Sequence, residues 1–346
     1  MEFYFDIAFF YQLTDQKLSE EVFDDFFKRF LARLNNTKIY FVAKNIQAVD
    51  LTEPNIFIQR ILTYYNAVPE IIDSTYLDDI ISSTDTSGFK FFFLTEALVV
   101  DSIINDYGFL AINPNTLNEI WSIIDSGRDD KKRFFSKEKG GNLISNWSQL
   151  NKCTLPINSL IITDRYLFSS EEDVEYNLVE ILKNIGLKKL GKRKVDILII
   201  GNEFYDCYKK RRKNRFYNGN IEFEQAFKKV KLTLDKIFGS SEDYNFTLLR
   251  TDEKTIPAEK EIHFRTLLSN TIFINPGHSF TILNKKGPKV GEYITIDYFL
   301  NSEIRNVNPE PLKLLKKALS KITDEPEIIK VHIHNEKKCQ ILNDNK

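Results

Sequence analysis

The amino-acid sequence predicts an α/β protein with two domains. Short apolar runs, typical of buried strands, alternate with helix-spaced segments along most of the chain, which favours parallel or mostly parallel sheets. A length of 346 residues suits two domains. The hydrophobic fraction of 42%, with 28 Phe and 15 Tyr, is sufficient for packed cores, and 13 Gly and 10 Pro argue against a long disordered region. We expect two Rossmann-like or mixed-sheet α/β domains.

The first third alternates strands and helices in this way. Apolar, mostly aromatic runs predict strands over residues 3–10, 38–43, 89–95 and 110–113. Ser19 can cap a helix whose apolar residues recur at helical spacing from Val22 to Leu34. Further helices are predicted over residues 55–65 and 76–82, in a segment ending near Gly108, and over 116–124.

The second part repeats the pattern. Ser169 and Glu172 have capping-box spacing for a helix that would end at Gly186, and Gly239 would close a helix over 221–238. Asn308-Pro309 would start the last helix. Strands are expected over residues 159–163, 194–200, 246–250, 294–299 and 328–334, and paired short strands within 261–283.

Residues 128–142, RDDKKRFFSKEKGGN, have the composition of a linker, because they are polar, charged and closed by Gly-Gly. They separate an acidic α/β domain at 1–127 from a basic one at 143–346. Residues 1–125 contain 8 Lys and Arg against 19 Asp and Glu, a net of −11, and the remainder contains 40 against 30, a net of +10. Such an asymmetry of charge is evidence about the binding partners of the protein rather than about its fold. Alternatively, the two halves attract each other within the chain or across a homodimer.

Composition also limits location. No run of about 18 apolar residues occurs, so we expect no transmembrane helix and no membrane partner. Cys153, Cys207 and Cys339 form no metal-binding pattern and are consistent with a reducing cytoplasm.

Two clusters of basic residues favour nucleic acid, RNA or DNA, as a partner. Cationic side chains neutralise phosphates, and neighbouring aromatic rings can stack on unpaired bases. The second cluster follows the carboxyl end of strand 194–200, where open α/β sheets place ligands. A solvated loop is the alternative. The predicted nucleic-acid-binding residues are Lys188, Lys189, Lys192, Arg193, Lys194, Lys209, Lys210, Arg211, Arg212, Lys213, Arg215 and Tyr217.

The stretch 261–283 contains a second candidate site for phosphate. On a strand, His263 and Arg265 share one face, and an imidazole beside a guanidinium suits a phosphate oxyanion. Asn270 and Gly277 follow at intervals of five and seven residues. The alternative is a surface strand whose His and Arg satisfy local hydrogen bonds.

This spacing, H-x-R-x4-N-x6-G, resembles the phospholipase D motif H-x-K-x4-D-x6-G-S over about 20 residues. The resemblance implies that His263, Arg265, Asn270 and His278 would be catalytic if the chain is an enzyme. Arginine, asparagine and His278 replace the usual lysine, aspartate and serine, and no second H-x-K occurs. The second domain would then be either a degenerate phospholipase D-like domain that binds phosphate without cleaving it, or one half of an active site that a homodimer completes.

Residues 3–124 loosely resemble a PIN-type nuclease domain, through an aspartate in the first strand, a later acidic pair and a strand that ends in Thr and an acid. The resemblance implies that Asp6, Asp78, Asp79 and Glu96 would hold Mg²⁺ or Mn²⁺. The family's asparagine-aspartate pair after the threonine is absent. Asp6 would otherwise bond a neighbouring backbone group or cation.

These observations favour a cytoplasmic nucleic-acid-binding protein without a cofactor. The two resemblances suggest a catalytically degenerate accessory subunit of a prokaryotic nucleic-acid-processing or antiviral defence system. One alternative is a nuclease, either PIN-like and metal-dependent or phospholipase D-like and histidine-dependent. Another is a component of a protein assembly.

Overall fold

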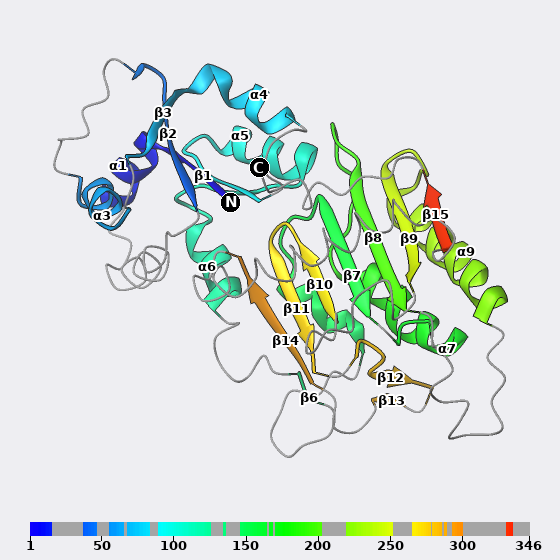
Figure 1. Cartoon of the computed structure of the whole chain (residues 1–346). Coiled ribbons are helices and arrows are strands. Elements are labelled where there is room, and N and C mark those ends of the chain that lie inside the picture. The colour runs from blue at the N-terminus through cyan, green and yellow to red at the C-terminus, as the bar shows by residue number, and fades with distance from the viewer. Residues whose placement is uncertain are drawn as a thin grey trace.

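The fold is described from a computed structural model of the chain (Figure 1). It consists of two main sheets with helices packed on them, which confirms the predicted α/β class. The structure describes residues 1–15, 37–46, 55–65, 68–83, 89–125, 134–135, 146–164, 166–168, 170–202, 219–251, 265–277, 279–285, 287–288, 293–299 and 330–334. The helices expected from Ser19 and from Asn308 lie outside these residues.

The first sheet is entirely parallel, with strand order β3-β2-β1-β4-β5. Aromatic side chains dominate its central strands and stack across them, for example Phe5 on Phe93 with ring centroids 4.5 Å apart and Tyr4 on Phe92 at 5.0 Å. Such rings bury large apolar areas, which stabilises a short-stranded sheet. The strands are β1 (Glu2–Asp6), β2 (Lys38–Ala43), β3 (Glu70–Asp73), β4 (Lys90–Phe93) and β5 (Leu110–Ile112).

The strand predicted over residues 3–10 is wrong in its second half. The chain changes from β1 to helix α1 (Ile7–Asp15) directly after Asp6, whose Oδ1 accepts a hydrogen bond from the backbone N–H of Ala8 at 3.0 Å. Phe9, Phe10 and Leu13 are buried at helical spacing. The apolar run conceals this boundary because both segments are buried.

Helices cover both faces of the first sheet (Figure 1). Leu77, Ile81, Val100 and Ile103 pack with Tyr4 and Phe92 on one face, whereas α1 contributes to the larger core on the other. The helices that follow α1 in this half are α3 (Ile56–Tyr64), the turn η2 (Ser74–Tyr76), α4 (Leu77–Ser82), α5 (Ala97–Ser102) with its π-helical continuation η3 (Ile103–Tyr107), and α6 (Leu117–Asp125).

The second sheet has eight strands in the order β15-β9-β8-β7-β10-β11-β14-β6. Strands β7, β8 and β9 are parallel, and the other neighbouring pairs are antiparallel. The strands are β6 (Phe134–Phe135), β7 (Ser159–Asp164), β8 (Val195–Asn202), β9 (Tyr244–Thr251), β10 (Thr266–Ser269), β11 (Ile272–Pro276), β14 (Tyr293–Tyr298) and β15 (Lys330–His334). A small separate ribbon pairs β12 (Leu283–Asn284) with β13 (Gly287–Pro288).

The helices of this half connect its parallel strands. A continuous helical stretch follows β7 and comprises α7 (Glu171–Asp173), η6 (Val174–Val179) and α8 (Glu180–Asn184). Ser170 caps it by accepting from the N–H of Asp173, one residue after the expected cap. The long helix α9 (Gly219–Phe238) joins β8 to β9 and ends at Gly239, as predicted, while η5 (Trp147–Cys153) precedes β7.

The expected linker contributes to the second sheet. Phe134 and Phe135 form β6, which pairs with Ile294 and Tyr293 of β14 at the edge of the sheet. The other residues of 128–142 lie outside the described part of the chain.

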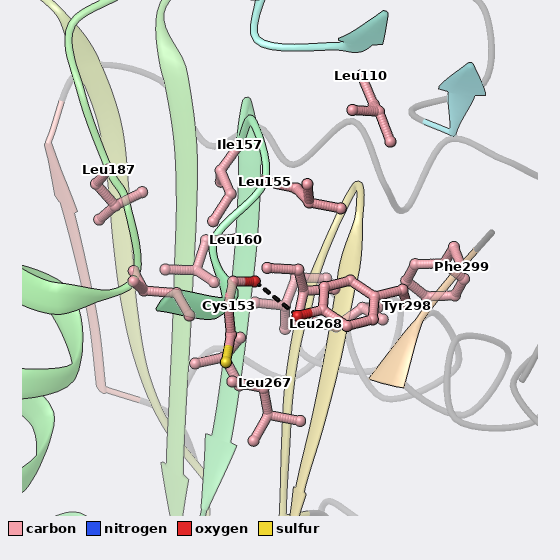
Figure 2. Packing of buried hydrophobic residues seen from close by; sticks show 14 of the residues in the cluster. Leu110, Cys153, Leu155, Ile157, Leu160, Leu187, Leu267, Leu268, Tyr298 and Phe299 are labelled. Carbon is pink, nitrogen blue, oxygen red and sulfur yellow. Dashed lines mark hydrogen bonds between the residues drawn. The ribbon is translucent and has the colours of Figure 1, made fainter. Parts of the chain in front are cut away.

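One hydrophobic core connects the two sheets. Leu110 of β5 belongs to the same buried cluster as Leu155, Leu267 and Phe299 of the second half (Figure 2). Within it, the Tyr298 hydroxyl donates a hydrogen bond to the Cys153 carbonyl at 3.0 Å. The two halves therefore pack against each other as a single folded unit.

Candidate functional site

The stretch with phospholipase D-like spacing forms an antiparallel hairpin, β10–β11, as the alternation of its side chains predicts. Thr266 pairs with Thr163 near the end of β7, so Arg265 lies at the carboxyl edge of the parallel strands. Because β11 runs back to this edge, Gly277 lies there too. Asn270 lies in the tight turn at the opposite edge, roughly 15 Å away at about 3.3 Å per residue.

Asn270 is a structural residue between the two halves, which corrects its place in the predicted catalytic set. Its side chain is buried, accepts from the N–H of Asn158 at 2.9 Å and donates to the Gly108 carbonyl at 3.0 Å. A longer bond of 3.4 Å reaches the Pro156 carbonyl. The spacing therefore describes the geometry of a hairpin rather than a convergence of four side chains.

Arg265 is a buried cationic residue at the carboxyl edge. Only 8% of the residue is exposed, and its guanidinium carbon lies 5.0 Å from the centre of the Tyr166 ring, a cation–π distance. Among the described residues it forms no ion pair within 4 Å, and its buried Nε has no hydrogen-bond partner. A buried guanidinium in this state is well suited to an anion.

Asp164, the last residue of β7, holds the loops around Arg265 in place. Its carboxylate accepts from the Tyr166 N–H at 2.7 Å, from the Ser279 hydroxyl at 2.8 Å and from the N–H of Phe280. Burial raises its pKa to about 6, although these hydrogen bonds and the charge of Arg265 lower it. Sequence reasoning missed this residue, and the signal that indicates it is an acid that closes a strand with an apolar centre, Leu160–Ile162.

The raised pKa of Asp164 predicts a specific pH dependence of stability. The unfolded-state pKa is about 3.9, so between about pH 4 and 6 the folded state binds more protons than the unfolded state. The contribution of Asp164 to the free energy of unfolding should therefore fall as pH rises through this window, by about 3 kcal/mol, and level off above it. We expect the difference in urea-unfolding free energy between wild type and Asp164→Asn to change by this amount. A difference that stays constant with pH would contradict the assignment.

The cluster at residues 188–194 is used to dock the two halves. Gly191 and Lys192 donate backbone N–H groups to the carbonyls of Asn105 and Asp106, each at 3.0 Å. Lys192 also pairs with Asp106 at 3.5 Å, and the electrostatic effect of Tyr107, together with this ion pair, raises the pKa of Lys192. The guanidinium of Arg193 lies 5.2 Å from the centre of the Phe109 ring.

Other lysines of this cluster also have local partners. Lys188 donates to the side chain of Asn105 at 2.8 Å, Lys189 pairs with Asp243 at 3.0 Å, and Lys194 lies 3.7 Å from Glu242. Of these ion pairs, the one between Lys192 and Asp106 joins the basic half to the acidic half, whereas those of Lys189 and Lys194 lie within the basic half.

The described acidic residues of the first half do not gather into a metal site. Asp6 and Glu96 both lie at the carboxyl edge of the first sheet, where Thr95 donates to Asp6 at 2.6 Å and Lys44 pairs with Glu96 at 3.0 Å. Asp78 and Asp79 lie in the first turn of α4. Among the described residues, no group of three or more His, Cys, Asp or Glu is arranged to hold an ion. The four carboxylates of the PIN-like alternative therefore do not converge on a metal position.

Several predicted residues lie outside the described part of the chain. These are His263, His278, Lys209, Lys210, Arg211, Arg212, Lys213, Arg215 and Tyr217. Their assignment remains a prediction from sequence. The two ends of the segment 203–218 are described, at Asn202 of β8 and Gly219 of α9. Strand β8 ends, at Asn202, on the edge of the second sheet that carries Arg265.

The protein is thus an α/β protein with two sheets that share a hydrophobic core. In the second sheet, a buried arginine lies at the carboxyl ends of the parallel strands. No helix in the described residues is long and apolar enough to cross a membrane. A comparison of the sequence with known protein families and with curated proteins gives no match.

Proposed function

We propose that this protein binds nucleic acid through its phosphate groups, at the carboxyl edge of the second sheet. The observation that carries the proposal is Arg265, a residue that is only 8% exposed, whose buried Nε has no hydrogen-bond partner and which has no ion-pair partner among the described residues. Removing an arginine from water is unfavourable unless an anion compensates it. Arginine also matches the geometry of a phosphate with two parallel donors.

The surroundings of Arg265 support an anionic ligand. Asp164 directs its carboxylate oxygens to Tyr166, Ser279 and Phe280 and forms no ion pair with Arg265 within 4 Å, so its charge offsets that of Arg265 only from a longer distance. Gly277, after β11, lies at the same edge, where the absence of a side chain lets a ligand approach the backbone, whereas Gly201 of β8 is covered by the Phe168 ring. Carboxyl ends of parallel strands are the usual ligand-binding edge of open α/β sheets.

The sequence of residues 203–218 favours a polyanion over a single phosphate as the ligand. This segment starts at the same edge and contains Lys209, Lys210, Arg211, Arg212, Lys213 and Arg215, with Tyr205, Tyr208 and Tyr217 among them. Consecutive cations fit consecutive phosphates, and the aromatic rings fit unpaired bases. Single-stranded nucleic acid is thus the proposed ligand. We further propose an accessory, non-catalytic role, because Asn270 lies away from Arg265.

The proposal predicts different effects for the two basic clusters. Replacing the six cations of 209–215 with glutamine should reduce the slope of log affinity against log salt by about 0.7 for each phosphate that the variant no longer neutralises. The matched control replaces Lys188, Lys189, Lys192 and Lys194, whose side chains already have local partners. It should leave the slope nearly unchanged. The measurement is fluorescence anisotropy of a labelled single-stranded oligonucleotide.

A point substitution tests the role of the buried arginine. Arg265→Gln should weaken oligonucleotide binding about ten-fold, because it removes a charge-assisted hydrogen bond to phosphate. Inorganic phosphate should compete with the wild type and much less with this variant. A wild-type affinity that does not depend on salt, or an unchanged affinity in Arg265→Gln, would overturn the proposal. Cleavage in EDTA that His263→Ala abolishes would contradict the non-catalytic role.

A further inference from the structure

Exposed apolar side chains concentrate on the first sheet. Among the described residues, every exposed large apolar side chain except Leu232 precedes residue 100. Three of them lie at the carboxyl edge, because each follows the end of a strand within a few residues, namely Ile46 after β2, Tyr76 after β3 and Leu98 after β4. Leu98 is 84% exposed and Tyr76 is 61% exposed. Exposed apolar groups collected at one edge indicate an interaction site.

Exposed carboxylates lie within three residues of Tyr76 and Leu98 in the chain. Asp78 and Asp79 are exposed in the first turn of α4, and Asp101 is exposed on α5, three residues after Leu98. None of these three forms an ion pair with a described residue. Glu96 pairs with Lys44, and the hydrogen bond and charge of Glu96 raise the pKa of this lysine. Helices α4 and α5 cover the same face of the sheet, so Asp78, Asp79 and Asp101 all lie on helices of that face.

The negative charge of this part of the surface determines which ligands it can bind. A phosphate backbone would be repelled, since the whole 1–125 region has a net charge of −11. A cationic partner would be attracted, and its apolar side chains would cover Leu98 and Tyr76. This edge and the edge that carries Arg265 are therefore suited to ligands of opposite charge.

We infer that the carboxyl edge of the first sheet docks a basic segment of a partner protein, one that carries leucine or aromatic side chains among its lysines and arginines. The exposed apolar residues supply the buried contacts, and Asp78, Asp79 and Asp101 supply charge complementarity. This inference does not rest on the proposed binding of nucleic acid, which concerns the other sheet.

The test measures binding of a synthetic peptide to the full chain. A labelled peptide built from lysine, leucine and one tryptophan should bind the wild type with an affinity that falls as salt rises. Leu98→Ser combined with Asp101→Asn should weaken it by about ten-fold, because an apolar contact and a charge are both removed. The matched control is Leu232→Ser combined with Glu224→Gln, which removes an exposed leucine and an exposed carboxylate from α9. It should bind like the wild type.

Other peptides and other ligands separate the alternatives. A peptide with glutamate in place of lysine should not bind, and one with serine in place of leucine should bind weakly. Equal loss of binding in both double variants would overturn the inference. Sedimentation that shows wild-type self-association, abolished by the Leu98 and Asp101 variant, would assign the surface to a second copy instead. Loss of oligonucleotide binding in the same variant would assign it to nucleic acid, and each of these results would also overturn the inference.

Discussion

Gly108→Ala is expected to lower the free energy of unfolding by about 3 kcal/mol. Gly108 ends η3 with a backbone φ of +65°, a conformation that costs an L-residue with a side chain about 1 to 2 kcal/mol. An added Cβ would also lie 2.9 Å from the Ile157 carbonyl oxygen and 3.0 Å from Leu190 Cδ1, both in the other half of the molecule. Backbone cannot move aside as a flexible side chain can, so the substitution should force the two sheets apart.

The matched control for this prediction is Gly239→Ala. Gly239 closes α9 with a φ of +76°, and nothing lies within 4 Å of an added Cβ. This variant should lose only the cost of the left-handed backbone, about 1 kcal/mol. Urea denaturation of both variants measures the difference. Equal losses of unfolding free energy in the two variants would contradict the predicted clash of the added Cβ at position 108 with Ile157 and Leu190.

Asn270→Asp is expected to destabilise the protein by about 3 kcal/mol. The amide of Asn270 donates to the carbonyls of Gly108 and Pro156, and a carboxylate would present acceptors to acceptors at a buried position. The substitution restores the aspartate of the phospholipase D motif. We expect no phosphodiesterase activity to appear, since the side chain lies at the edge opposite Arg265.

The control for charge is Asn105→Asp, at an exposed residue of the same interface. The Asn105 side chain accepts from Lys188 Nζ at 2.8 Å, so a carboxylate there faces a cation and should change stability by less than about 0.5 kcal/mol. Thermal unfolding of both variants tests the comparison. Similar melting temperatures for Asn270→Asp and wild type would refute the structural role of Asn270, and phosphodiesterase activity in that variant would restore the catalytic interpretation.

Local patterns in the sequence were sufficient for most of the fold. Apolar runs predicted β7, β8 and β9 to within a few residues, and Gly186 and Gly239 marked helix ends, because both adopt positive φ. The short strand β3 was missed, since its four residues EIID include acids at both ends and are only partly buried. The transition from β1 to α1 was missed because nearly all residues on both sides of it are apolar, so the change from strand to helical spacing of apolar residues is not visible in the sequence.

The site was less accessible from sequence, because its parts meet only through tertiary contacts. Spacing alone grouped Asn270 with Arg265, although the hairpin puts them at opposite edges. Charge alone grouped 188–194 with 209–215, although the first cluster binds Asn105 and Asp106 across the interface. Conversely, the contact of Asp164 with Ser279 joins residues that are 115 positions apart. Which charges are already compensated becomes clear only in three dimensions.

Photo-crosslinking is the most direct test of the central claim, that nucleic acid binds at the carboxyl edge of the second sheet. The full chain would be irradiated with single-stranded RNA containing 4-thiouridine, and the crosslinked peptides identified by mass spectrometry. We predict crosslinks within residues 203–218 and 265–285, and weaker crosslinking in Arg265→Gln. Crosslinks confined to residues 188–194, or to the edge of the first sheet that carries Glu96, would contradict the account.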